Sequence, residues 1–285
     1  NIWLYLIMSL FKNRLRQYVM LNIHVSLALV SLVLLTYHYT GFSVDWVYVV
    51  FAGLGTLVAY TYIKNVPPQA SIFVAVKQVL KQSPIWIHFL GLLVLGLASF
   101  FNQAQEWALI SIVMLCLGYI LPGSKALPSP LRDFGAVKII IVAFAWSGVT
   151  VLVPMLSFGH TVVDLAALFI AQTLWIIVLT IPFEIRDSSK DQLRHPTWPQ
   201  KLGLLRVKIL GTFLILSNIG IHFWLHLGQY QWLNQSISFV DLPYLLTMGL
   251  SFFGLIMAKP KQSFWYSAFW IEAIPIAWLV MICLL

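Results

Sequence analysis

Residues Val162–Phe183 read VVDLAALFIAQTLWIIVLTIPF, an apolar run that contains a single charge, Asp164. About 20 mostly apolar residues are enough for an α-helix to cross the hydrocarbon core of a bilayer. The run is continuous rather than alternating, which favours a helix over a strand of a membrane barrel. The stretch therefore predicts a transmembrane helix, and the charged residues after it predict where this helix leaves the membrane.

Eight further stretches share this apolar character, although one of them is short. They are Val19–Tyr37, Val44–Ile63, Ile85–Phe101, Trp107–Leu121 (the short one), Ala136–Leu156, Val207–Leu227, Val240–Met257 and Phe264–Leu285. The composition agrees, because 60% of the residues are apolar and 9% are charged, whereas soluble domains carry about 25% charged residues. The chain is therefore predicted to be all-α, with nine transmembrane helices in one domain, residues 1–285.

If the nine stretches cross the membrane, all 17 Lys and Arg residues fall on the same side of it. They precede the first helix or lie in every second loop, and the four intervening loops contain none. Basic residues collect in cytoplasmic loops. We therefore expect a bacterial inner-membrane protein with a cytoplasmic N-terminus and an outer C-terminus. The same rule accounts for the net charge of +8 without a nucleic-acid partner.

Two smaller features fit this topology. Ile2–Arg16 is too short to span, begins with apolar and aromatic residues and ends in three basic ones, which predicts a helix in the membrane interface. The alternative is an N-terminal extension of the first span. Four acids stand at the outer ends of spans, where they are expected to cap helix N-termini or face water: Asp45, Glu106, Asp164 and Asp241.

The cytoplasmic end of the sixth span carries three acids at the spacing E-x-x-D-x-x-x-D. Glu184, Asp187 and Asp191 would share one face of a continuing helix. Mg²⁺ suits such a face, because it takes one or two carboxylates and completes its shell with water and phosphate oxygens. The interleaved Arg186, Lys190 and Arg194 could hold further phosphate charge. The alternative is a solvated loop of mixed charges.

The same region resembles the UbiA superfamily of intramembrane prenyltransferases. Glu184-Ile-Arg-Asp187-Ser-Ser-Lys-Asp191, followed by His195-Pro-Thr-Trp-Pro-Gln-Lys-Leu-Gly203, is similar to that family's second aspartate motif and its trailing segment. Tyr119, Pro128-Ser-Pro-Leu-Arg132, Lys138 and Trp146 look like the loop between the family's helices 4 and 5 and the start of helix 5. The nine predicted helices agree with this resemblance.

The resemblance implies nine helices around a central cavity that opens to the cytoplasm and to lipid. It implies Mg²⁺ bound between two acidic motifs, here with Asp187 and Asp191 as ligands and Glu184 beside them. The metal would bind the diphosphate of a polyprenyl donor, whose departure leaves an allylic cation for an acceptor to attack. The residues expected to contact such a substrate are Tyr60, Lys64, Tyr119, Arg132, Lys138, Arg186, Lys190 and Arg194.

The chain departs from this family at the first aspartate motif. The corresponding stretch, Gly55–Asn65, contains no acid, and no Asp or Glu occurs from Trp46 to Gln105. Tyr60, Tyr62, Lys64 and Asn65 stand there instead. Lysine can supply a positive charge to a phosphate, but it cannot coordinate Mg²⁺. We therefore expect at most one Mg²⁺, bound together with a diphosphate.

Two polar residues lie deep in predicted spans. Glu272 is 11 residues beyond Lys261 and Asn218 is 10 beyond Lys208, which places both at a depth of roughly 15 Å. Acids within a membrane are costly and are usually functional or paired. The matched depth predicts a hydrogen bond between Asn218 and Glu272; the alternative for Glu272 is contact with a partner subunit.

Two functions follow from this sequence. The first is a UbiA-fold protein that has lost the two-metal chemistry and binds an isoprenoid or quinone-like lipid, or serves as a structural subunit of a membrane complex. The alternative is an active Mg²⁺-dependent prenyltransferase that transfers a polyprenyl group to a lipophilic acceptor. The acid-free stretch Trp46–Gln105 favours the first function, and the intact acids Glu184, Asp187 and Asp191 favour the second.

Overall fold

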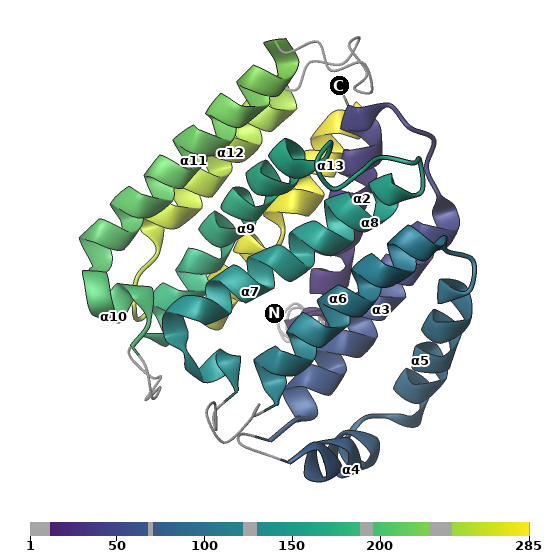
Figure 1. The fold of residues 1–285 in the computed structure, drawn as a ribbon. Helices are drawn as coiled ribbons and strands as arrows, with labels where there is room; N and C mark the ends of the chain where they lie inside the picture. Colours follow the sequence, from purple (N-terminus) through teal and green to yellow (C-terminus); the bar gives the residue numbers. More distant parts are fainter. Residues whose placement is uncertain (1–11, 68–70, 122–129, 189–195, 228–240, 285) are drawn as a thin grey trace, which may run out of the picture.

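The computed structural model describes residues 12–67, 71–121, 130–188, 196–227 and 241–284 (Figure 1). Within these ranges the chain forms helices and contains no strand. The predicted all-α class is therefore confirmed for the described part of the chain. Of the predicted interfacial helix Ile2–Arg16, residues 1–11 lie outside the described ranges, and residues 12–20 are helical.

Each of the nine predicted stretches contains helix. The elements are α2 (Ile23–Thr40), α3 (Trp46–Asn65), α5 (Ile85–Ala98), α6 (Gln103–Ile120), α7 (Gly135–Ser147) continued by η2 (Gly148–Leu152) and α8 (Val153–Leu156), α9 (Ala166–Asp187), α11 (Leu204–Leu227), α12 (Leu242–Met257), and η3 (Tyr266–Ile271) followed by α13 (Ile274–Leu284). The short fourth stretch is a helix of 18 residues.

Seven of the described helices are long and apolar enough to cross a membrane, or eight if a bent pair is counted as one span. That pair joins α4 (Ile72–Gln82) to α5, and its axes are bent by 115°. The apolar helix α12 has only 16 residues. The chain is therefore a polytopic membrane protein, while the total of nine spans stays a prediction.

Helix α9 lies inside the bundle, where it packs against α7, α11 and α12. Trp175 of α9 is almost fully buried. Its indole N–H donates to the hydroxyl of Ser251 on α12 at 3.0 Å, and its ring meets that of Trp278 on α13 edge-on, with ring centroids 5.2 Å apart. Helix α2 packs against α3 and α13 on the other side of the bundle (Figure 1).

The prediction that four acids cap helix N-termini or face water is confirmed, because Asp45 and Asp241 cap helices and Glu106 and Asp164 are exposed. The carboxylate of Asp45 accepts a hydrogen bond from the backbone N–H of Tyr48 at the start of α3, and Asp241 does the same for Tyr244 at the start of α12. These bonds satisfy backbone donors that a helix N-terminus leaves unpaired. Glu106 lies in the first turn of α6, where Asn102 is the cap.

Helix α4 is an addition to the predicted fold, because its 11 residues fall between two predicted spans. It lies across one end of the bundle, the end that also carries α10 (Trp198–Leu202) (Figure 1). Its apolar residues Ile72, Phe73, Val76 and Leu80 are exposed, and Phe73 retains 86% of its accessible surface. An apolar face on a short helix that also carries lysines is typical of a helix in the membrane interface.

Two helices contain π-helical segments, η2 after α7 and η3 before α13. A π segment inserts an extra residue into a turn, so later side chains point in directions that a regular α-helix would not give them. The backbone N–H of Glu272 reaches back to the carbonyl of Ser267, five residues earlier, at 3.4 Å. This local winding sets the direction of the Glu272 side chain.

Candidate functional site

A cavity of about 270 Å³ lies among α2, α3, α6, α7, α9 and the η3–α13 segment. Its wall is mainly apolar, and the residues that line it are Ala28, Tyr60, Tyr119, Lys138, Ile139, Val142, Trp146, Ile176, Leu179, Thr180, Phe183, Glu184, Ile271, Glu272 and Pro275. Pockets for small ligands usually measure about 300–1,000 Å³ and combine apolar walls with a few polar groups. The cavity is thus close to the lower end of that range.

Four of the predicted site residues meet in this cavity. Tyr60, Tyr119, Lys138 and Glu184 come from four different helices, α3, α6, α7 and α9. Residues this far apart in the sequence become neighbours only because the helices surround one space.

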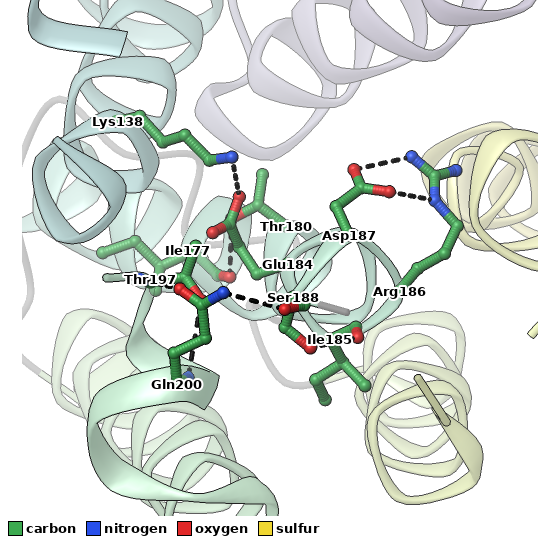
Figure 2. Close-up of polar contacts among 10 residues, drawn as sticks. All are labelled: Lys138, Ile177, Thr180, Glu184, Ile185, Arg186, Asp187, Ser188, Thr197 and Gln200. Atoms are coloured by element: carbon green, nitrogen blue, oxygen red, sulfur yellow. Dashed lines mark hydrogen bonds and ion pairs between the residues drawn. The ribbon is translucent and has the colours of Figure 1, made fainter. Parts of the chain in front are cut away.

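Lys138 and Glu184 form an ion pair in the wall of the cavity. The Lys138 Nζ lies 2.8 Å from Glu184 Oε1, and the two side chains retain 17% and 6% of their accessible surface (Figure 2). A charge this deeply buried is tolerated because its partner is close. The pair joins α7 to α9 and neutralises the lysine that was expected to contact a phosphate.

Asp187 binds a different cation. Arg186 donates from Nε and Nη2 to its two carboxylate oxygens at 2.6 and 2.8 Å. The remaining Nη1 donates to the hydroxyl of Ser267 at 2.7 Å. Figure 2 shows the carboxylates of Glu184 and Asp187 turned toward different partners, Lys138 and Arg186. The two acids thus do not converge on one point, although they are three residues apart on one helix.

Of the two predicted Mg²⁺ ligands, Asp187 and Asp191, the structure describes only Asp187. Both oxygens of Asp187 already accept hydrogen bonds from Arg186. In the described part of the chain, no three His, Cys, Asp or Glu side chains are grouped as metal ligands would be. Asp191, Lys190 and Arg194 lie outside the described residues, so their predicted roles stay predictions.

Helix α3 supplies the side chains that replace the missing first motif. The Tyr60 hydroxyl accepts a hydrogen bond from the indole N–H of Trp146 at 3.0 Å inside the cavity. Lys64 instead donates to the side-chain oxygen of Asn22, at the start of α2. Tyr62 and Asn65 are not among the residues that line the cavity. Their side chains form hydrogen bonds with His88 and Ser83, at 3.0 and 2.9 Å.

Arg132 lies in the 3₁₀ turn η1 (Leu131–Asp133) before α7. Its Nη1 donates a long hydrogen bond of 3.4 Å to the carbonyl of Val66, after the end of α3. Arg132 interacts electrostatically with the Tyr119 hydroxyl, which in turn lines the cavity. Arg132 therefore lies beside the cavity rather than in its wall.

The predicted contact between Asn218 and Glu272 is wrong. The Asn218 amide donates to the carbonyl of Ala171 at 2.6 Å and accepts a hydrogen bond from the hydroxyl of Tyr244 at 2.7 Å. Glu272 lines the cavity instead. Depth along a helix does not determine which way a side chain points, and the π segment η3 changes that direction just before Glu272.

Glu272 is thus a member of the site that sequence reasoning assigned to another contact. It interacts electrostatically with Lys64 and Arg186, which lie on two other helices, and with Tyr60 inside the cavity. Its position deep in a predicted span is the signal that could have identified it, because such acids are usually functional or paired.

No model of a known protein family, no curated protein and no solved structure matches the chain. The resemblance to the UbiA superfamily therefore remains a prediction that rests on the motif residues and on the order of the helices.

Proposed function

We propose that this protein binds an isoprenoid or quinone-like lipid in its central cavity and does not carry out metal-dependent diphosphate chemistry. The observation that supports this most directly is the cavity itself, whose mainly apolar wall includes a small number of polar groups. Lipophilic molecules with a polar head are suited to such a lining, because the wall takes the hydrocarbon and the polar groups orient the head.

The pairing of the charged residues supports binding rather than diphosphate ionisation. A departing diphosphate requires cations aimed at its developing charge. Lys138 is engaged by Glu184, and Arg186 by Asp187. Recruiting either cation to a phosphate would separate it from a carboxylate at contact distance, and in the case of Glu184 would leave that carboxylate buried.

The size of the cavity indicates how much of a ligand it encloses. At about 270 Å³ it can take a head group and the first isoprene units. The remainder of a longer chain would run between the helices toward the bilayer. A binding function of this kind needs no partner protein; a role as a structural subunit would instead need a surface that a partner covers.

The alternative is the Mg²⁺-dependent prenyltransferase. It is favoured by one observation, that Glu184 of the second motif lines the same cavity as Tyr119 and Lys138. In that function the residues would bind the donor and hold its diphosphate at the end of α9 near Asp187. The chemistry of bond cleavage would come from the metal.

Lipid binding can be tested by photocrosslinking. The purified protein in nanodiscs is labelled with a farnesol analogue that carries a diazirine, and the labelled peptides are identified by mass spectrometry. We expect labels on α7 and α9, and at least a fivefold loss of labelling in Val142→Phe, which would fill the cavity. Val113→Phe, at an exposed position on α6, is the matched control.

Labelling that is equal in the two variants, or that is confined to outward-facing residues, would exclude the cavity as the binding site and favour a structural role.

A further inference from the structure

Glu272 is an acidic residue of the cavity lining to which the proposed function gives no role. Its carboxyl group lines the cavity, yet among the described residues it accepts no hydrogen bond. Glu272 is only partly withdrawn from solvent, so a molecule in the cavity can reach its carboxyl group. A ligand that donates a hydrogen bond would therefore gain from binding beside it.

Tyr60 complements this carboxyl group. Its hydroxyl oxygen accepts the indole N–H of Trp146, which orients the ring and leaves the hydroxyl hydrogen with no acceptor in the described part of the chain. A hydroxyl is one donor and two acceptor sites. Tyr60 can therefore donate to a ligand oxygen while Glu272, with which it interacts electrostatically, accepts from the same group.

The charges in the cavity wall disfavour an anion. The described lining contains one basic residue, Lys138, and two acidic ones, Glu184 and Glu272, and the lysine is already paired with Glu184. The two further cations near Glu272 are engaged as well, Lys64 by Asn22 and Arg186 by Asp187. A diphosphate in this space would therefore find no uncommitted cation among these described residues, whereas an uncharged head group needs none.

We propose that the cavity selects an uncharged isoprenoid alcohol, whose hydroxyl donates to Glu272 and accepts from Tyr60. This inference rests on the lipid-binding function proposed above and adds the class of head group. It differs from what the family resemblance implies, because the head group is an alcohol rather than a diphosphate. No covalent step is involved.

Three probes with the same fifteen-carbon chain separate these head groups: farnesol, farnesyl methyl ether and farnesyl diphosphate with Mg²⁺. Binding to the purified protein in nanodiscs is measured by displacement of the photoreactive farnesol analogue. We expect farnesol to bind about five- to tenfold more tightly than the ether, the scale of one hydrogen bond, and the diphosphate to bind most weakly.

The substitution Glu272→Leu should abolish the preference for alcohol over ether and leave the affinity for the ether nearly unchanged. Thr173→Val is the matched control on α9 outside the cavity lining, because the Thr173 hydroxyl already donates within its own helix, to the carbonyl of Phe169 at 2.8 Å. It should keep the preference.

Two results would overturn the inference while leaving lipid binding intact: equal affinities for farnesol and its ether in the unmodified protein, or a diphosphate that binds most tightly. If none of the three probes displaced the analogue, the proposed function itself would fail, and the inference with it. The comparison of alcohol with ether is made in the unmodified protein, so it does not depend on the folding of any variant.

Discussion

Lys138 of α7 and Glu184 of α9 lie 2.8 Å apart in the wall of the central cavity, and both are largely withdrawn from water. This ion pair places a residue near the start of α7 against the first acid of the motif at the end of α9. It fixes two helices that both line the cavity, and it occupies a cation that a phosphate ligand would otherwise use. Both stability and ligand preference should therefore respond to it.

The first prediction concerns the stability of this pair. Lys138→Met leaves Glu184 buried without its cation and should lower the free energy of unfolding by about 3–5 kcal/mol. The double variant Lys138→Met/Glu184→Met should recover most of that loss, because no charge then remains buried. Reversible unfolding in mixed detergent micelles measures both values.

Lys77→Met, on the exposed face of α4, is the control for the loss of a positive charge and should change stability little. A double variant no more stable than Lys138→Met would show that the pair does not act as a unit.

The second prediction concerns packing between α7 and the segment that precedes α10. A Cβ added at Gly135 would lie 2.8 Å from the backbone N and Cα of Thr197, and backbone atoms cannot turn aside as a flexible side chain can. Gly135→Ala should therefore destabilise the protein by about 1–3 kcal/mol, the usual cost of overpacking. Thermal unfolding in detergent measures the effect.

Gly220→Ala is the matched control for this substitution, since nothing lies within 4 Å of the added Cβ. Alanine also favours a helix over glycine, so this variant should be as stable as the unmodified protein or slightly more so. Equal melting temperatures for Gly135→Ala and Gly220→Ala would contradict the packing described for Thr197.

The third prediction concerns topology. All 17 basic residues lie in or next to one set of alternate loops, and this predicts that the N-terminus and the region around Lys201 are cytoplasmic and the C-terminus is outside. Alkaline phosphatase fused after Leu285 should be active and the same reporter inserted near Lys201 inactive, with a fluorescent-protein reporter giving the reverse. Both sites on one side of the membrane would require an even number of spans between them instead of the three predicted.

Much of the fold could be predicted from the sequence because a membrane imposes a simple rule. A helix that crosses it needs a sufficient apolar length, and that length is visible in one sequence. All nine apolar stretches contain helix in the structure, and the caps Asp45 and Asp241 follow from the acids that precede them. Helix α4 was not predicted because its 11 residues are too few for a span.

The site could be predicted only in part, because hydropathy does not specify how helices turn toward each other. Four residues predicted for the site line the cavity: Tyr60, Tyr119, Lys138 and Glu184. Lys64 does not, since it bonds to Asn22. Glu272 was placed at a suitable depth but given the wrong partner, because a single sequence contains no record of the π segment that redirects it.

The central claim is that this protein binds a lipid in its cavity without transferring it, and a transferase assay tests it most directly. Purified protein in liposomes is incubated with labelled farnesyl diphosphate, Mg²⁺ and a hydroxybenzoate or chlorin acceptor, with Asp187→Asn as the control. We predict no prenylated product above the protein-free background. Robust Mg²⁺-dependent transfer that Asp187→Asn abolishes would contradict the claim and show the protein to be a prenyltransferase.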